Sequence, residues 1–163
     1  MKSSWIKAIL ALPFNATVTI PAILFIFSGE AFTLPDIFFG ICGFFIFFIG
    51  LALAIWTMRL FAKIGKGTLA PWNPTKKLIV QGPYGYVRNP MLSGVLMMIL
   101  GESLIFGSWC LFGWFAAFLL VNTIYFMLSE EKGLEKRFGR EYLEYKKNVP
   151  RWIPRLTKWS PDN

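Results

Sequence analysis

The first group of residues whose types could bind a ligand lies in one loop, residues 82–90. Residues 82–90 read Gly-Pro-Tyr-Gly-Tyr-Val-Arg-Asn-Pro and stand directly before an apolar stretch. A helix that begins there leaves its first backbone amides without intrahelical partners, so they can donate hydrogen bonds to a carboxylate or hydroxyl of a ligand. Taken alone, the loop is equally compatible with a tight turn whose tyrosines lie at the lipid headgroups and whose Arg88 contacts lipid phosphate.

A carboxylate inside an apolar stretch is the second candidate. Glu102 follows Met91 by about 16 Å along a helix that rises ~1.5 Å per residue. An ionisable group at that depth in a membrane is a functional-site hypothesis, so Glu102 is a candidate catalytic residue that attracts an amine headgroup or accepts a proton. The alternative is a neutral acid hydrogen-bonded to Asn15, Thr17 or Thr19 of the first apolar stretch.

Two adjacent carboxylates, Glu130 and Glu131, follow the last apolar stretch. Ionised carboxylates accept hydrogen bonds from hydroxyl and ammonium groups of a ligand. Without other motifs, the pair is more typical of the solvated start of a helix, where it pairs with Lys132 or with basic loop residues.

The composition excludes several chemistries and indicates a membrane protein. The 163 residues include no histidine, which excludes Ser-His triads, two-histidine zinc sites and haem ligation by histidine. Cys42 and Cys110 lack the spacing of a metal knuckle or a disulfide framework, so we expect no metal. Apolar residues make up 55% and charged residues only 16%. The formal charge of +8 is confined to a few segments, which favours a membrane protein over a nucleic-acid partner.

The elements that must position these residues are apolar stretches of nearly membrane-spanning length. A bilayer core needs about 20 apolar residues. The stretches run over 6–27, 37–61, 91–106 and 109–128. The first is longer than the apolar part of a signal peptide, so we expect a span there. Cations avoid segment 28–36, and the positive-inside rule therefore predicts four transmembrane helices with both termini and the loop over 63–90 in the cytoplasm.

Beyond residue 128 the pattern becomes charged and amphipathic. Leu134, Phe138, Tyr142 and Tyr145 follow helical spacing. We expect the fourth span to continue as an amphipathic C-terminal helix whose aromatic face lies on the membrane or on the loop. Two tryptophans beside basic residues predict an interfacial anchor on anionic lipid. These residues are Trp152, Trp159, Arg151, Arg155 and Lys158. No second domain is indicated, so residues 1–163 form one domain.

Several motifs, in this order and spacing, carry a family resemblance. They are Gly82-Pro83-Tyr84, Tyr86 to Pro90 with Gly94, Glu130-Glu131 with Leu134, Phe138-Gly139, Glu141 to Pro150, and Ile153-Pro154. Together they resemble the isoprenylcysteine carboxyl methyltransferase and phospholipid methyltransferase superfamily over roughly residues 65–155. The resemblance implies an all-α integral membrane methyltransferase that takes its methyl group from S-adenosylmethionine and acts on a lipophilic acceptor at the cytoplasmic face.

The resemblance also implies the cofactor residues by position. They are Lys77, Leu78, Ile79, Tyr84, Asn89, Pro90, Met91, Leu92 and Glu130. The residue types suit S-adenosylmethionine, because Leu78, Ile79 and Leu92 can sandwich an adenine ring. Glu130 can accept hydrogen bonds from ribose hydroxyls or the ammonium group, and Asn89 can both donate and accept.

Four positions bear on the acceptor. The carboxyl methyltransferases usually have histidine at the position of Asn89 and tyrosine at that of Leu92. The residues of this chain are more similar to the phospholipid methyltransferase side of the superfamily. Phe126 stands where the eukaryotic prenylcysteine enzymes have a substrate-side arginine. A buried carboxylate acceptor would need that cation, whereas Glu102 adds an anion. We therefore expect a neutral or cationic headgroup, such as that of an amino lipid.

Three other interpretations stay open at this point. The first is a carboxyl O-methyltransferase that acts on an isoprenylcysteine-like acid. The second is a non-catalytic membrane protein that retains the fold. The third is a nicotinamide-dependent reductase similar to sterol reductases, which share the Arg-x-Pro and paired-glutamate region but normally have much longer chains.

Overall fold

The computed structural model describes residues 10–30, 36–65 and 77–161, and all regular elements in these ranges are helical. The first helix begins with the π-helical segment Leu10–Thr19 and continues as α2 (Ile20–Phe27). Three further helices follow: α3 (Ile37–Leu60), α4 (Pro90–Phe106) and α5 (Trp109–Tyr125). The all-α class predicted from the sequence is confirmed for the described residues, and each predicted apolar stretch forms a helix over its described part; residues 6–9 of the first stretch lie outside the described residues.

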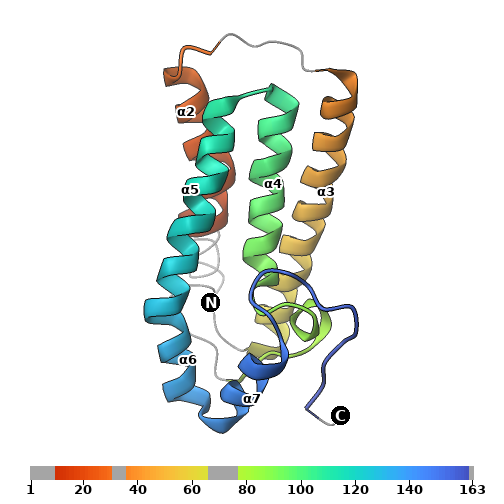
Figure 1. Cartoon of the computed structure of the whole chain (residues 1–163), viewed down its shortest axis with the longest axis vertical. Helices are drawn as coiled ribbons and strands as arrows, with labels where there is room; N and C mark the ends of the chain where they lie inside the picture. The colour runs from red at the N-terminus through yellow and green to blue at the C-terminus, as the bar shows by residue number, and fades with distance from the viewer. Residues whose placement is uncertain (1–9, 31–35, 66–76, 162–163) are drawn as a thin grey trace.

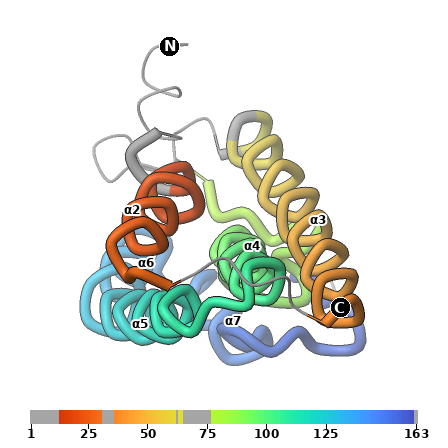
Figure 2. The backbone as a smooth tube through the Cα atoms, turned by 90° about the horizontal axis from the view of Figure 1, so that it is seen from above, coloured from red at the N-terminus to blue at the C-terminus, as the bar shows by residue number. Residues whose placement is uncertain are grey.

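The helices run side by side as a bundle in which α4 lies between α3 and α5 (Figures 1 and 2). Two helices are long and apolar enough to cross a membrane, Ile37–Leu60 and the continuous helix Trp109–Phe138. The other two apolar helices, Pro13–Phe27 and Pro90–Phe106, are shorter. Of the four predicted spans, two therefore have the length and composition of a membrane crossing among the described residues.

Paired glycines bring α3 and α4 into backbone contact. A Cβ atom added at Gly50 would lie 2.5 Å from the carbonyl oxygen of Gly94. One added at Gly43 would lie 2.7 Å from the carbonyl oxygen of Gly101. Small residues at such contacts are typical of helix pairs in membranes, where close packing replaces the hydrophobic effect. The contact fixes the start of α4 relative to the end of α3.

A tight turn joins α4 to α5 at one end of the bundle. Gly107 adopts a φ of +58°, and the Ser108 side chain caps α5 by accepting a hydrogen bond from Leu111 N. Glu30, which follows α2, accepts hydrogen bonds from Ser108 Oγ and from the backbone amide of Cys110. These contacts fasten the end of the first helix to the start of α5.

The long helix changes geometry before it leaves the bundle. Its α-helical part ends at Tyr125, and the π-helical segment Phe126–Glu130 leads into α6 (Glu131–Phe138). Within the π-helical segment, the amide of Glu131 donates to the carbonyl of Phe126, five residues back. Such π-helical turns occur often at functional sites.

The predicted single amphipathic helix after residue 128 is wrong, because the chain breaks at Gly139. Gly139 has a φ of +54°, a conformation that favours glycine, and α7 (Arg140–Asn148) starts in a new direction. Tyr142 and Tyr145 are buried, and Leu134 and Phe138 pack against them. The aromatic stripe therefore packs inside the protein around the loop rather than on lipid.

The C-terminal segment 149–161 runs along the loop over 82–88, below the bundle (Figure 1). The Arg88 amide donates to Pro150 O, the Arg155 amide to Tyr86 O, and the Trp159 amide to Gly85 O, at 2.9–3.0 Å. These three backbone hydrogen bonds hold the loop and the segment together as one unit.

The predicted interfacial anchor of tryptophans is wrong. Trp159 is only 8% exposed and packs against Tyr145, with tilted rings whose centroids lie 5.7 Å apart. Trp152 donates its indole N–H to Thr123 Oγ1 of α5 at 3.1 Å. Both indoles thus serve packing, because the segment folds back on the loop and on α5.

Candidate functional site

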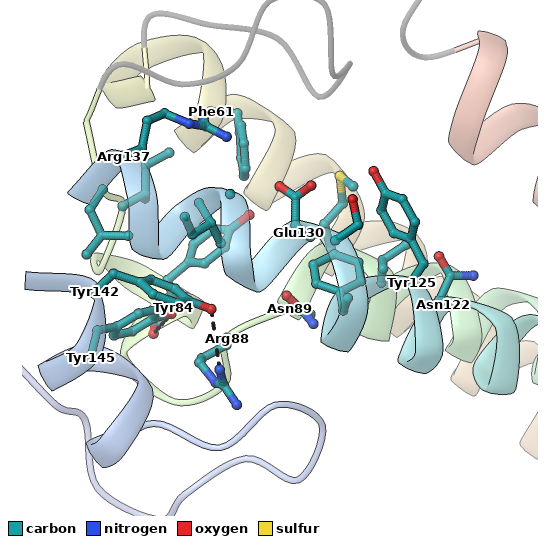
Figure 3. A pocket seen from close by; sticks show the side chains of 18 of the residues that line it. Phe61, Tyr84, Arg88, Asn89, Asn122, Tyr125, Glu130, Arg137, Tyr142 and Tyr145 are labelled. Carbon is teal, nitrogen blue, oxygen red and sulfur yellow. Dashed lines mark hydrogen bonds between the residues drawn. The ribbon is translucent and has the colours of Figure 1, made fainter. Parts of the chain in front are cut away.

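A cavity of about 650 Å³ lies where residues 78–89, the start of α4, α5 and α6 meet. Residues 78–89 are called the loop from here on. Figure 3 shows side chains that line the cavity. Small-molecule sites in proteins commonly enclose ~300–1,000 Å³. The cavity is lined by seven of the residues predicted to bind the cofactor: Leu78, Ile79, Tyr84, Asn89, Met91, Leu92 and Glu130. Lys77 is exposed and Pro90 is buried, and neither lines the cavity.

The loop supplies an apolar wall and a rigid aromatic one. Ile79 and Tyr84 are buried, and the ring of Tyr84 lies 5.7 Å, centroid to centroid, from Phe61 after α3. Tyr145 Oη donates to Tyr84 O at 2.8 Å. Burial raises the pKa of the Tyr84 hydroxyl well above its usual value of 10.0, and the nearby Tyr145 adds to the shift. Burial also raises the pKa of Tyr145, so both phenols are neutral at physiological pH.

The residue before α4, Asn89, has a polar side chain that lines the cavity. Asn89 is the N-cap residue, but its side chain makes no capping hydrogen bond. The backbone carbonyl oxygen of Asn89 accepts hydrogen bonds from the backbone amide of Ser93 at 3.0 Å and from its hydroxyl at 3.1 Å. Pro90 occupies the first helical position, where a missing N–H costs nothing. The amide group of Asn89 thus lines the cavity as a donor and an acceptor.

The two adjacent glutamates have opposite environments. Glu130 lines the cavity at the end of the π-helical segment. Glu131, only 4% exposed, pairs with Arg88 Nη1 at 3.0 Å, Lys146 Nζ at 3.0 Å and Arg151 Nη2 at 2.6 Å. Neighbouring helical positions differ by ~100° in direction, so one of the pair can face a ligand while the other cannot.

The ion cluster of Glu131, Arg88, Lys146 and Arg151 connects four segments beneath the cavity. Arg88 comes from the loop, Lys146 from α7 and Arg151 from the C-terminal segment. A buried charge needs partners of opposite sign to offset its desolvation, and Glu131 has three. Arg88 also lines the cavity, so the cluster fixes part of the cavity floor. The alternative that the glutamate pair contacts basic loop residues is confirmed for Glu131 and Arg88, whereas the sequence did not indicate Lys146 or Arg151 as partners.

Helix α5 extends the cavity toward the apolar bundle. Its lining side chains are Phe118, Val121, Asn122, Tyr125 and Phe126, opposite Pro13 and Val95. Asn122 donates to Phe118 O at 2.8 Å, which leaves its amide oxygen as an acceptor. Phe126 lines the wall at the position where the resemblance would place an arginine in prenylcysteine enzymes. This part of the cavity suits an apolar group.

Arg137 is a lining residue that the sequence reasoning missed. It follows Glu130 by seven residues, which is two helical turns, so helical spacing could have placed both on one face. In the sequence, the run of charged residues around Arg137 obscures this spacing.

Glu102 lies apart from the other candidate residues. It lines a second cavity of about 570 Å³ between α2, α3 and α4. Its Oε2 atom is buried without a hydrogen-bond partner among the residues that the structure describes. Thr17 lines the same cavity, but its hydroxyl donates to Pro13 O at 2.8 Å.

Comparisons with known proteins place the same region in a family. A family model described as phospholipid methyltransferase matches residues 38–141. The protein-S-isoprenylcysteine O-methyltransferase of Schizosaccharomyces pombe is 32% identical over 88 residues, which cover 50% of this chain and 35% of the relative. The match thus spans about a third of the length of that relative. No solved structure matches the chain.

Proposed function

Since this chain belongs to the phospholipid methyltransferase family, we propose that it transfers a methyl group from S-adenosylmethionine to a lipophilic acceptor at the cytoplasmic face of a membrane. The observation that carries the proposal is the cavity of about 650 Å³, because it unites seven residues that the family resemblance assigns to the cofactor. Its volume leaves room for a cofactor and part of an acceptor.

The lining residues fit the chemical groups of S-adenosylmethionine, which supplies an electrophilic methyl group on a sulfonium. Leu78, Ile79 and Leu92 offer apolar surfaces for the adenine ring. Glu130 can accept hydrogen bonds from ribose or ammonium, and Asn89 can donate or accept. The main contribution of the protein is then to position both substrates and to exclude water.

The α5 side of the cavity supports an acceptor with apolar chains and an uncharged or cationic headgroup. Val95, Phe118 and Val121 form apolar walls, and Phe126 adds no cation for a carboxylate. An amino lipid is the acceptor class we propose. For Glu102 we propose no contact with the transferred methyl group, because it lines the second cavity.

We propose that all four apolar helices span the membrane, with both termini in the cytoplasm. The loop, α6, α7 and the C-terminal segment lie together at one end of the bundle (Figure 1). That end carries most of the cations, whereas the other end carries Glu30 and the uncharged turn at Gly107 and Ser108. The positive-inside rule assigns the cationic end to the cytoplasm.

Calorimetric titration of the detergent-purified protein tests the cofactor. We expect S-adenosylmethionine to bind and reduced nicotinamide dinucleotide not to bind. Glu130→Gln should weaken S-adenosylmethionine binding about tenfold to a hundredfold, because a hydrogen bond to a charged group contributes ~1.5–3 kcal/mol. Glu141→Gln removes an equal charge from an exposed position on α7 and should leave affinity unchanged. Affinity for the nicotinamide alone would overturn the proposal.

Carboxyl O-methylation is the second candidate, and the similarity to an isoprenylcysteine O-methyltransferase favours it. The two are separated by supplying radiolabelled methyl donor with either phosphatidylethanolamine vesicles or a prenylcysteine analogue. We expect labelled amino lipid. Label in the prenylcysteine analogue alone would assign the second candidate instead.

A further inference from the structure

One face of α6 and of the segment before it carries a gap between two opposite charges. Glu130, Gly133 and Arg137 recur at spacings of three and four residues, and all three line the cavity. Side chains at this spacing lie above one another on a helix. Figure 3 shows Glu130 and Arg137 along the same side of the cavity, with Phe61 beside them.

Gly133 leaves the space between these charges open. A Cβ atom built at Gly133 would have Arg137 Nη2 as its neighbour at 3.9 Å. The guanidinium therefore folds back along the helix, over the glycine and toward Glu130. The result is a notch, defined by Glu130, Gly133 and Arg137, with an anion at one end and a cation at the other.

A notch of this kind complements a zwitterion. The amino acid end of S-adenosylmethionine carries a carboxylate and an ammonium on the same carbon. An arginine presents paired N–H donors that match a carboxylate, and a glutamate accepts from an ammonium. Without a side chain at position 133, both groups can enter between the two charges.

We infer that the notch binds the amino acid end of the methyl donor, with Arg137 on its carboxylate and Glu130 on its ammonium. This inference rests on the proposed function, which names the donor. It adds a residue that the family resemblance did not supply, and it assigns Glu130 to the ammonium rather than to the ribose.

Three ligands separate the contributions in calorimetric titrations: S-adenosylmethionine, its decarboxylated form, and 5′-methylthioadenosine, which lacks the amino acid end. Arg137→Gln should weaken S-adenosylmethionine about tenfold to a hundredfold and leave the decarboxylated form unchanged. Lys136→Gln is the matched control, because Lys136 is exposed, carries the same charge and does not line the cavity. It should change neither affinity.

Two further variants test the other parts of the notch. Glu130→Gln should weaken both S-adenosylmethionine and its decarboxylated form, since each carries the ammonium, but not 5′-methylthioadenosine. Gly133→Leu fills the notch and should give the same pattern. Leucine favours helices over glycine, and a Cβ fits at this position, so this variant should fold. An unchanged midpoint of thermal unfolding in detergent confirms that each variant is folded.

The outcomes distinguish this inference from the proposed function. If the unaltered protein fails to bind S-adenosylmethionine, the proposed function falls. If it binds but Arg137→Gln affects both donor forms equally, or neither, the assignment of Arg137 to the carboxylate is wrong. If Glu130→Gln weakens 5′-methylthioadenosine as well, the carboxylate contacts the ribose and the assignment to the ammonium is wrong.

Discussion

The interface between α3 and α4 and the ion cluster around Glu131 hold the molecule together by opposite means. In the first, glycine backbones touch and no charge takes part. In the second, a buried carboxylate gathers three cations from separate segments. Glycines let the two helix backbones approach closely, and this close packing supplies van der Waals attraction. The interface between α3 and α4 therefore tolerates no added side-chain atom, and the ion cluster around Glu131 tolerates no lost charge.

The largest effect should come from adding a side chain to the helix interface. Gly50→Leu places its Cβ within 2.5 Å of the carbonyl oxygen of Gly94, so the backbones must separate. We expect a loss of about 3 kcal/mol or more, measured as thermal unfolding in detergent. Gly113→Leu on α5 is the control, since a Cβ there meets nothing within 4 Å. Equal stability of both variants would contradict the tight interface.

The next effect should follow from neutralising the centre of the ion cluster. Glu131→Gln leaves Arg88 and Arg151 without their carboxylate. Losing one partner of a buried ion pair costs ~3–5 kcal/mol, but the amide of glutamine retains part of the hydrogen bonding, so we expect a loss of about 2 kcal/mol. Glu135→Gln is the control, because it makes the same chemical change at a half-exposed glutamate that pairs with Lys146. It should lower the free energy of unfolding by at most about 1 kcal/mol. If chemical denaturation shows equal losses, Glu131 has no special role in stability.

The smallest effect should come from the hydrogen bond between the two buried tyrosines. Tyr145→Phe removes the donor to Tyr84 O and leaves a buried carbonyl unpaired, at a cost of about 1–2 kcal/mol. The exposed Tyr86→Phe serves as the control and should stay within about 0.5 kcal/mol. Near-equal melting temperatures would mean that water replaces the lost donor.

The helices and part of the site could be predicted because their signals are local. Apolar runs place all four helices of the bundle, and the loop motif with Glu130 leads to the cavity. The break at Gly139 could not be predicted, since the apolar positions keep helical spacing across it and glycine alone does not end a helix. For Glu131, pairing with a basic loop residue could be predicted, but the choice of Arg88 and the addition of Arg151 could not, because they lie 43 residues before it and 20 after it and only the tertiary fold brings them together.

The π-helical segment Phe126–Glu130 has a consequence for chain length among relatives. A turn closed by a hydrogen bond to the fifth residue holds one residue more than an α-helical turn. Deleting one residue here would restore an ordinary turn while α6 keeps its orientation to α5. An aligned relative can therefore carry a one-residue gap at 126–130 and still direct the corresponding glutamate into its cavity. A one-residue deletion between Glu130 and Arg137 would instead rotate one of these charged side chains about the helix axis, away from the other.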